Sequence, residues 1–209
     1  MTICDQWAWK PNDNMKSLKE CIHTLIRTNG GDGNLLFNVG PQPDGLIEGR
    51  QVERLKEMGT WLEKNSAAIY GTRGGPWKPS SHMVSTRSGD KIYLHLLRKV
   101  DGPVTAPALP VAIKSAKLLK GPVIKTTTAD ESLTLEIPNN AWDEIDTIVE
   151  LTIDGDAMDI APLKASTRAN IPGAKASASV IYQNDPQYSA EMVLDADPQT
   201  RRATPEATP

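Results

Sequence analysis

A short apolar segment between two helical patterns restricts the fold of this 209-residue chain more than any other feature. The segment "NLLFN" occupies residues 34–38, and its three central residues are all apolar, as in a strand that is covered on both faces. A loop dense in glycine and proline, "VGPQPDG", follows at residues 39–45. We therefore predict a buried strand that ends in a rigid, polar loop.

Helical periodicity flanks this strand on both sides. Residues 13–29 predict a helix that Asn12 or Asp13 can cap and that "GGDG" ends, and residues 48–65 predict a second helix. The apolar stripes are Leu18, Ile22, Leu25 and Ile26 in the first helix and Val52, Leu55, Met58 and Leu62 in the second. The order helix, strand, loop, helix is typical of an α/β layer with parallel strands.

A single buried strand cannot stand alone, because its backbone N–H and C=O groups would be left unpaired. The sequence offers no parallel neighbour for "NLLFN", so we expect roughly the first 70 residues to be the last part of a larger α/β domain. Met1 is then expected to be an internal methionine or the edge of a truncated gene. The lack of a signal-peptide pattern therefore does not indicate the destination of the whole protein.

The pattern changes after "IYGTRGGPWKP" to short alternating segments separated by turn residues. We predict an antiparallel β-sandwich with strands at residues 91–99, 111–119, 123–128, 132–138 and 146–154. The fold class is therefore α/β followed by all-β. The expected parts are residues 1–79 (α/β), 80–155 (sandwich), 156–173 (linker) and 174–209, the truncated start of a further β module.

Composition excludes several classes of protein. The net charge of −3 and the pI near 5.7 argue against nucleic acid or an anionic membrane as the main partner. No apolar run approaches the roughly 18 residues of a membrane span. Cys4, Cys21 and the scattered His23, His82 and His95 do not have the spacing of a metal site or a disulfide scaffold. We expect no metal and no cofactor, and we expect the histidines to be structural or solvated.

Three blocks of sequence resemble a known family. These blocks, "DQWAWKPNDNMKSLKECIHTLI", "GGDGNLLFNVGPQPDGLIEGRQVERLKEMGTWL" and "AAIYGTRGGP", are similar to the end of the catalytic domain of α-L-fucosidases, glycoside hydrolase family 29. They resemble most the branch that acts on α-1,3- and α-1,4-linked fucose. The final segment, with "ASASVIYQ" and "AEMVLDADPQTR", is similar to the start of discoidin-type galactose-binding-like modules, where Arg202 stands in place of a common tryptophan.

The resemblance implies the C-terminal part of a (β/α)8-like barrel, with "NLLFN" as the last strand and the loops after the strands at the active site. It also implies a retaining glycosidase with two carboxyl groups about 5–5.5 Å apart. The family's nucleophilic Asp and acid/base Glu lie upstream of the matching blocks. We therefore expect no catalytic residue in this chain and no activity from the chain alone. The expected partner is a fucosylated oligosaccharide or glycoconjugate, and full-length members are expected to be extracellular, periplasmic or lysosomal.

Four residues are predicted to bind the substrate. Trp7 and Trp9 lie in the loop "DQWAWKP", and an indole ring covers the apolar face of fucose well; the alternative is packing beneath the loop. Asn38 and Gln42 flank the end of the predicted strand and are expected to hydrogen-bond sugar hydroxyls. The remaining tryptophans, Trp61, Trp77 and Trp142, are expected to be structural.

Three aspartates invite a catalytic interpretation that other roles explain better. Asp44 precedes Gly45 in a turn, Asp32 lies in a glycine-rich connector, and Asp5 can hydrogen-bond within its own loop. A second hypothesis for the whole chain is a non-enzymatic carbohydrate-binding or structural accessory protein. That hypothesis requires a partner to cover the exposed side of "NLLFN". The sequence predicts no particular oligomeric state.

Overall fold

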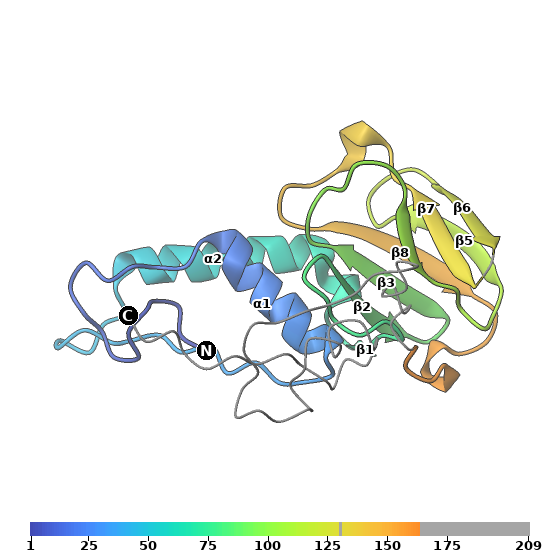
Figure 1. The fold of residues 1–209 in the computed structure, drawn as a ribbon. Coiled ribbons are helices and arrows are strands. Elements are labelled where there is room, and N and C mark those ends of the chain that lie inside the picture. The colour runs from blue at the N-terminus through green and yellow to red at the C-terminus, as the bar shows by residue number, and fades with distance from the viewer. Residues whose placement is uncertain (130, 164–209) are drawn as a thin grey trace, which may run out of the picture. The chain divides into compact units, whose positions relative to one another are not determined.

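The computed structural model describes residues 1–129 and 131–163. The first helix and the C-terminal part of the second helix pack on one face of a five-stranded sheet, and a three-stranded sheet packs on the other (Figure 1). Residues 1–163 form one compact unit. Most of the predicted linker, the predicted module at 174–209 and Arg202 lie outside the described residues.

The predicted antiparallel β-sandwich is confirmed. The larger sheet has the order β1-β2-β3-β8-β5 and the smaller one the order β4-β7-β6, and all the paired strands are antiparallel. The strands are β1 Arg73–Gly74, β2 Met83–Ser88, β3 Lys91–Leu96, β4 Val104–Pro107, β5 Ile113–Leu118, β6 Lys125–Ala129, β7 Ser132–Glu136 and β8 Thr147–Ile153. The sequence patterns located five of these strands and missed β1, β2 and β4.

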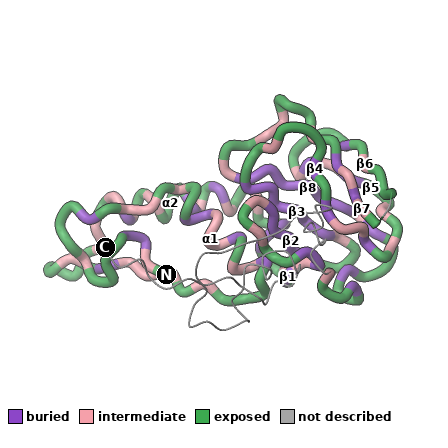
Figure 2. Tube along the Cα trace, viewed as in Figure 1, coloured by how far each residue is buried: buried purple, intermediate pink, exposed green. Residues whose placement is uncertain are grey.

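The central strands of the larger sheet are buried on both faces, since successive side chains point to opposite sides of a strand. Ile92 and Leu94 of β3 pack with Leu133 of the smaller sheet. Tyr93 of the same strand packs with Ile22 and other residues of the helical layer. Figure 2 shows the result as nearly continuous buried segments along β2, β3 and β8.

The first helix, α1 (Leu18–Gly30), begins later than predicted. Its cap is Ser17, which forms a capping box with Glu20, and the expected caps Asn12 and Asp13 are wrong. Asn12 has a positive φ of 56°, and the Asp13 carboxylate accepts a hydrogen bond from the Gln6 backbone N–H instead. The pattern Ser-x-x-Glu was present in the sequence as the better signal.

The second helix, α2 (Gly49–Asn65), has its predicted bounds within one residue but a different buried face. Of the predicted stripe only Met58 is buried, while Leu55 is 39% exposed. Gln51 and Trp61 are buried beside Met58, so the buried face is rotated relative to the predicted stripe. Trp61 is structural, as expected.

The predicted buried strand "NLLFN" is wrong in two respects. The segment forms no strand, and Leu36 is 68% exposed. It does have a parallel neighbour in this chain, because Ile3 N donates to Asn38 O at 3.0 Å and Asn38 N donates to Met1 O at 2.8 Å. The segment is therefore a partly exposed stretch with one short parallel pairing, in which Phe37 packs against the core of the helical layer.

A buried polar network joins the helical layer to the larger sheet. His95 Nδ1 lies 2.6 Å from Asp146 Oδ2, and both side chains are fully buried. His95 Nε2 lies 3.3 Å from the Thr86 hydroxyl, which donates to the Ala68 carbonyl at 2.7 Å. Burial raises the pKa of Asp146, with His95 acting in the opposite direction. His95 is therefore a structural histidine, as predicted.

Candidate functional site

The predicted site residues lie on two loops that touch each other near the start of α2. Asn38 Nδ2 donates to the Trp7 carbonyl at 2.7 Å, which ties the loop of residues 5–13 to the segment 38–48. A Cβ atom at Gly40 would lie 2.5 Å from Trp9 N, so the two backbones approach more closely than any other residue allows. The fold thus brings Trp7, Trp9 and Asn38 together.

The two tryptophans are held differently. Trp7 is 65% exposed, and its hydrogen bond from Asn38 reaches its backbone rather than its ring. Trp9 is partly buried, and its indole Nε1 donates to Glu48 Oε2 at 3.2 Å. An indole with one polar edge fixed and apolar surface exposed suits the apolar face of a sugar. The structure therefore presents two aromatic rings on one pair of loops.

Sequence reasoning missed the charged residues that support these loops. Glu48 immediately precedes α2 and forms an ion pair with Arg50, whose Nη1 donates to the Asp13 carbonyl at 2.6 Å. The hydrogen bond from Arg50 is the largest cause that holds the pKa of Glu48 below its usual value; those from Gln51 and Trp9 add to it. The acid at the start of a predicted helix was a usable signal, because anions are stabilised there.

Asn38 and Gln42, the two residues predicted to hydrogen-bond the sugar, differ in how the fold holds them. The Asn38 NH₂ group is used by the Trp7 carbonyl and, at 3.4 Å, by the Thr2 hydroxyl. Gln42 lies in a tight hairpin, where its N–H donates to Leu46 O at 2.8 Å and its carbonyl accepts from Gly45 N at 2.9 Å. Asn38 thus clamps the loops, while Gln42 is positioned by its backbone and its side chain is partly exposed.

Of the three aspartates that could suggest a catalytic acid, Asp44 has the turn role expected from its local sequence and Asp32 has an ion-pair role that was not predicted. Asp44 Oδ1 accepts from Leu46 N at 3.0 Å within the turn. Both carboxylate oxygens of Asp32 bind Arg73, at 2.7 and 2.6 Å, and this pairing holds the pKa of Asp32 far below its usual value. Asp5 is exposed, and its N–H donates to Asn14 O.

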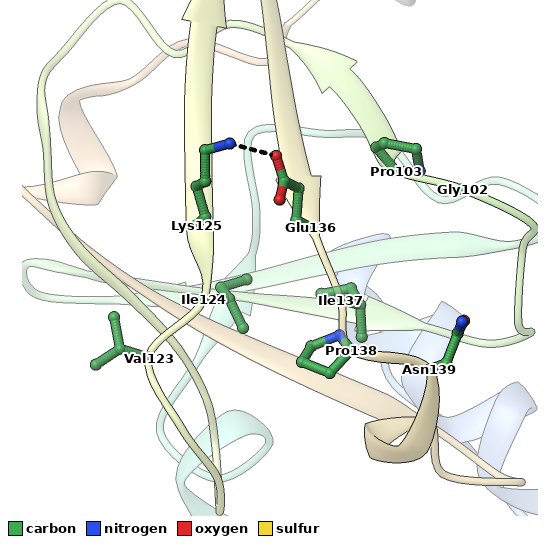
Figure 3. A pocket seen from close by; sticks show the side chains of 9 residues that line it. All are labelled: Gly102, Pro103, Val123, Ile124, Lys125, Glu136, Ile137, Pro138 and Asn139. Carbon is green, nitrogen blue, oxygen red and sulfur yellow. Dashed lines mark hydrogen bonds and ion pairs between the residues drawn. The ribbon is translucent and has the colours of Figure 1, made fainter.

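A cavity of about 570 Å³ lies elsewhere, on the smaller sheet of the sandwich (Figure 3). Its walls include Val123, Ile137 and Pro138, and its two charged residues, Lys125 and Glu136, pair with each other at 2.8 Å. No aromatic residue lines it. It lacks the ring that a sugar would stack on, so the loop pair is the stronger candidate site.

Other kinds of site find little support in the part of the chain that the structure describes. Residues 1–129 and 131–163 contain no group of three or more His, Cys, Asp or Glu side chains that could hold a metal ion. Neither described helix combines the length and apolar character needed to cross a bilayer. Cys4 and Cys21 are free thiols, and burial raises the pKa of each.

Comparisons with known proteins find similarity to one family of enzymes. Residues 1–67 match the family model described as Alpha-L-fucosidase. Human tissue alpha-L-fucosidase is 28% identical over 151 residues, which cover 66% of this chain and 32% of that enzyme. Rat plasma alpha-L-fucosidase is 41% identical over 90 residues, covering 41% of this chain and 19% of the enzyme. The chain spans about a third of the length of the first of these relatives.

Solved structures agree with the sequence matches. Alpha-L-fucosidase isoenzyme 1 from Paenibacillus thiaminolyticus superimposes with a TM-score of 0.66 and 28% identity, over 74% of this chain and 39% of that one. The Thermotoga maritima alpha-fucosidase in complex with fucose superimposes with a TM-score of 0.62 and 25% identity, over 73% of this chain and 38% of that one. These matches show that the chain is similar to part of several glycoside hydrolases. The proteins that it resembles are α-L-fucosidases, in line with the resemblance of the three sequence blocks.

Proposed function

We propose that this chain supplies part of the fucose-binding pocket of an α-L-fucosidase. The observation that carries the proposal is the contact between the loop 5–13 and the segment 38–48, which brings Trp7, Trp9 and Asn38 together. Both loops fall within the residues that match the family model. One structural relative, the Thermotoga maritima alpha-fucosidase, has been solved in complex with fucose, which supports the same ligand here.

The short parallel pairing supports a barrel origin for these loops. Residues 1–3 pair in parallel with the end of "NLLFN", and α1 lies between the two segments in the chain. A parallel pair joined by a helix is the βαβ unit from which such barrels are built. In this proposal residues 1–3 and 36–38 are neighbouring barrel strands. The loops after them then lie on the face where barrel enzymes bind substrate.

The proposed contacts follow from the chemistry of fucose. The exposed ring of Trp7 and the partly buried ring of Trp9 provide surfaces for the apolar face and methyl group of the sugar. The NH₂ group of Asn38 is occupied, so its carbonyl oxygen is the atom left to accept from a sugar hydroxyl. Gln42 offers a side-chain amide on the adjoining hairpin.

Hydrolysis with retention needs a nucleophilic carboxylate and an acid/base carboxyl. We assign neither to this chain, because Asp32 and Asp44 have ion-pair and turn roles and Asp5 is an exposed loop residue. The pair is then supplied by a part of the enzyme that this chain does not match, since the match covers 32% of the human tissue enzyme. A preference for α-1,3- or α-1,4-linked fucose belongs to the same proposal.

The test compares the chain with a chimera in which it replaces the matching part of the Thermotoga maritima enzyme. We expect no turnover of 4-nitrophenyl α-L-fucopyranoside by the 209-residue chain and turnover by the chimera. Replacing Trp7 or Trp9 by alanine should raise the KM of the chimera about 2- to 10-fold, as expected for loss of one aromatic contact. Turnover by the chain alone, or an unchanged KM in both variants, would overturn the proposal.

The accessory-protein hypothesis is not favoured. The family match falls on residues 1–67, which contain the loops and both helices, whereas a self-sufficient binding module would place its site on the sandwich. The sandwich cavity has no aromatic lining.

A further inference from the structure

Three donors converge on the carboxylate of Glu48. Trp9 Nε1 donates to Oε2 at 3.2 Å, Gln51 Nε2 donates to the same oxygen at 3.3 Å, and Arg50 pairs with Oε1. The Glu48 side chain is 21% exposed, so the group is shielded from water without being isolated from it. The Glu48 carboxylate thus connects the start of α2 to the indole of Trp9, a predicted substrate-binding residue.

Trp9 is restrained at two separate points. Its backbone is in close contact with Gly40, and its ring nitrogen is bonded to Glu48. For Trp7, in contrast, the hydrogen bond from Asn38 reaches the backbone carbonyl. Fixing both the backbone and the ring edge leaves an indole little freedom to rotate. Trp9 is therefore the ring whose orientation the protein sets.

The carboxylate of Glu48 is itself aligned by a second set of contacts. Arg50 pairs with it and donates from Nη1 to the Asp13 carbonyl at 2.6 Å. Asp13 Oδ2 accepts from the Gln6 backbone N–H at 2.8 Å. Both ends of the loop at residues 5–13 are thus joined to the start of α2.

A charged acceptor makes the bond to the indole stronger. Arg50 holds the pKa of Glu48 below its usual value, so this side chain is a carboxylate at neutral pH. Hydrogen bonds to ionised acceptors are roughly twice as strong as those between neutral groups. The bond to Trp9 is therefore worth more than an ordinary loop contact.

We propose that Glu48 is a positioning residue that sets the plane of the Trp9 indole against the substrate sugar, with Arg50 aligning the Glu48 carboxylate. The orienting role of Glu48 stands on the geometry above. Its consequence for the sugar rests on the proposed function, because that function places Trp9 in the fucose pocket.

The orienting role can be tested in the 209-residue chain without any sugar. The chain has five tryptophans, so ¹⁵N-labelled protein should give five indole N–H signals, and the Trp9→Phe variant identifies the one from Trp9. We expect Glu48→Ala to shift this signal and to raise its hydrogen-exchange rate about tenfold or more, because the N–H loses a charged acceptor. The signals of the buried Trp61 and Trp77 should not change.

A matched control is Glu57→Ala, which removes a glutamate within α2 that also pairs with an arginine, Arg54, at 2.7 Å. It should leave the Trp9 signal and its exchange rate unchanged. If Glu48→Ala does not fold, Glu48→Leu decides instead, because leucine fills similar space without an acceptor. Unchanged exchange of the Trp9 N–H in the folded variant would overturn the proposal.

The consequence for the sugar is tested in the chimera by a double-mutant cycle. Glu48→Ala should raise KM or lower kcat by no more than Trp9→Ala does, and it should have no further effect once Trp9 is alanine. If Trp9→Ala changes the kinetics and Glu48→Ala does not, the positioning proposal is wrong. If neither Trp9→Ala nor Trp7→Ala changes them, the proposed function is wrong, and the indole exchange still decides whether Glu48 orients Trp9.

Discussion

The β-sandwich and the loops before it differ in how far their apolar side chains are buried. In the sandwich, Leu133, Leu151 and Ile153 are completely buried, because the two sheets cover each other. In the loops, Trp7 and Leu36 are 65% and 68% exposed. Loops commonly carry binding residues on a scaffold that other elements stabilise. The difference indicates that the sheets contribute much of the buried apolar surface, while the exposed side chains of the loops include the residues that we propose to bind the sugar.

The largest expected effect comes from disrupting the buried polar network that joins the larger sheet to the helical layer. Asp146→Ala leaves His95 buried without its acceptor, and we expect it to lower the free energy of unfolding by about 3–5 kcal/mol. Urea unfolding followed by circular dichroism measures the change. A loss below about 1 kcal/mol would show that the network contributes little.

A pair of leucine substitutions sharpens the contrast directly. Leu133→Ala removes a fully buried side chain between the sheets and should cost about 2–5 kcal/mol. Leu36→Ala changes an exposed side chain and should cost less than about 0.5 kcal/mol. Equal losses in urea unfolding would contradict the division between a stabilising sandwich and an exposed loop surface.

The smallest expected effect concerns the ion pair at the boundary of the two regions. The folded-state pKa of Asp32 is depressed by Arg73, so its contribution to stability is present above the unfolded pKa of about 3.9 and is lost as the pH falls below it. The melting temperature of Asp32→Asn should therefore lie below that of the parent at pH 6 and approach it toward pH 2. Asparagine tolerates the positive φ of 60° at this position, so the backbone is not disturbed. A constant difference at all pH values would exclude the ion pair as the cause.

Much of the sandwich could be predicted because alternation and turn residues are local signals. β2 was missed because it is polar: Ser85 and Thr86 are fully buried, and their hydroxyls bond to the carbonyls of Trp77 and Ala68. A polar residue that finds a backbone partner is as well accommodated in a core as an apolar one, and the sequence does not show that partner.

The candidate site was predictable only in part. Trp7 and Trp9 stand out as aromatic residues in a short polar loop, and the resemblance gave them a role. The bond between Trp9 and Glu48 joins residues 39 positions apart, so it depends on how the loop meets α2. The apolar run of "NLLFN" was misleading for a related reason, since its pairing partner is the first three residues of the chain.

The apolar face that the larger sheet buries against the helical layer determines whether the sandwich can be produced on its own. Its outer face carries Val84, Tyr93, Leu97 and Ile148, all buried against the helical layer. Cutting the chain before β1 would expose these side chains to water as one apolar surface, and such surfaces promote aggregation. A soluble sandwich therefore requires either α1 and α2 or polar replacements at these four positions.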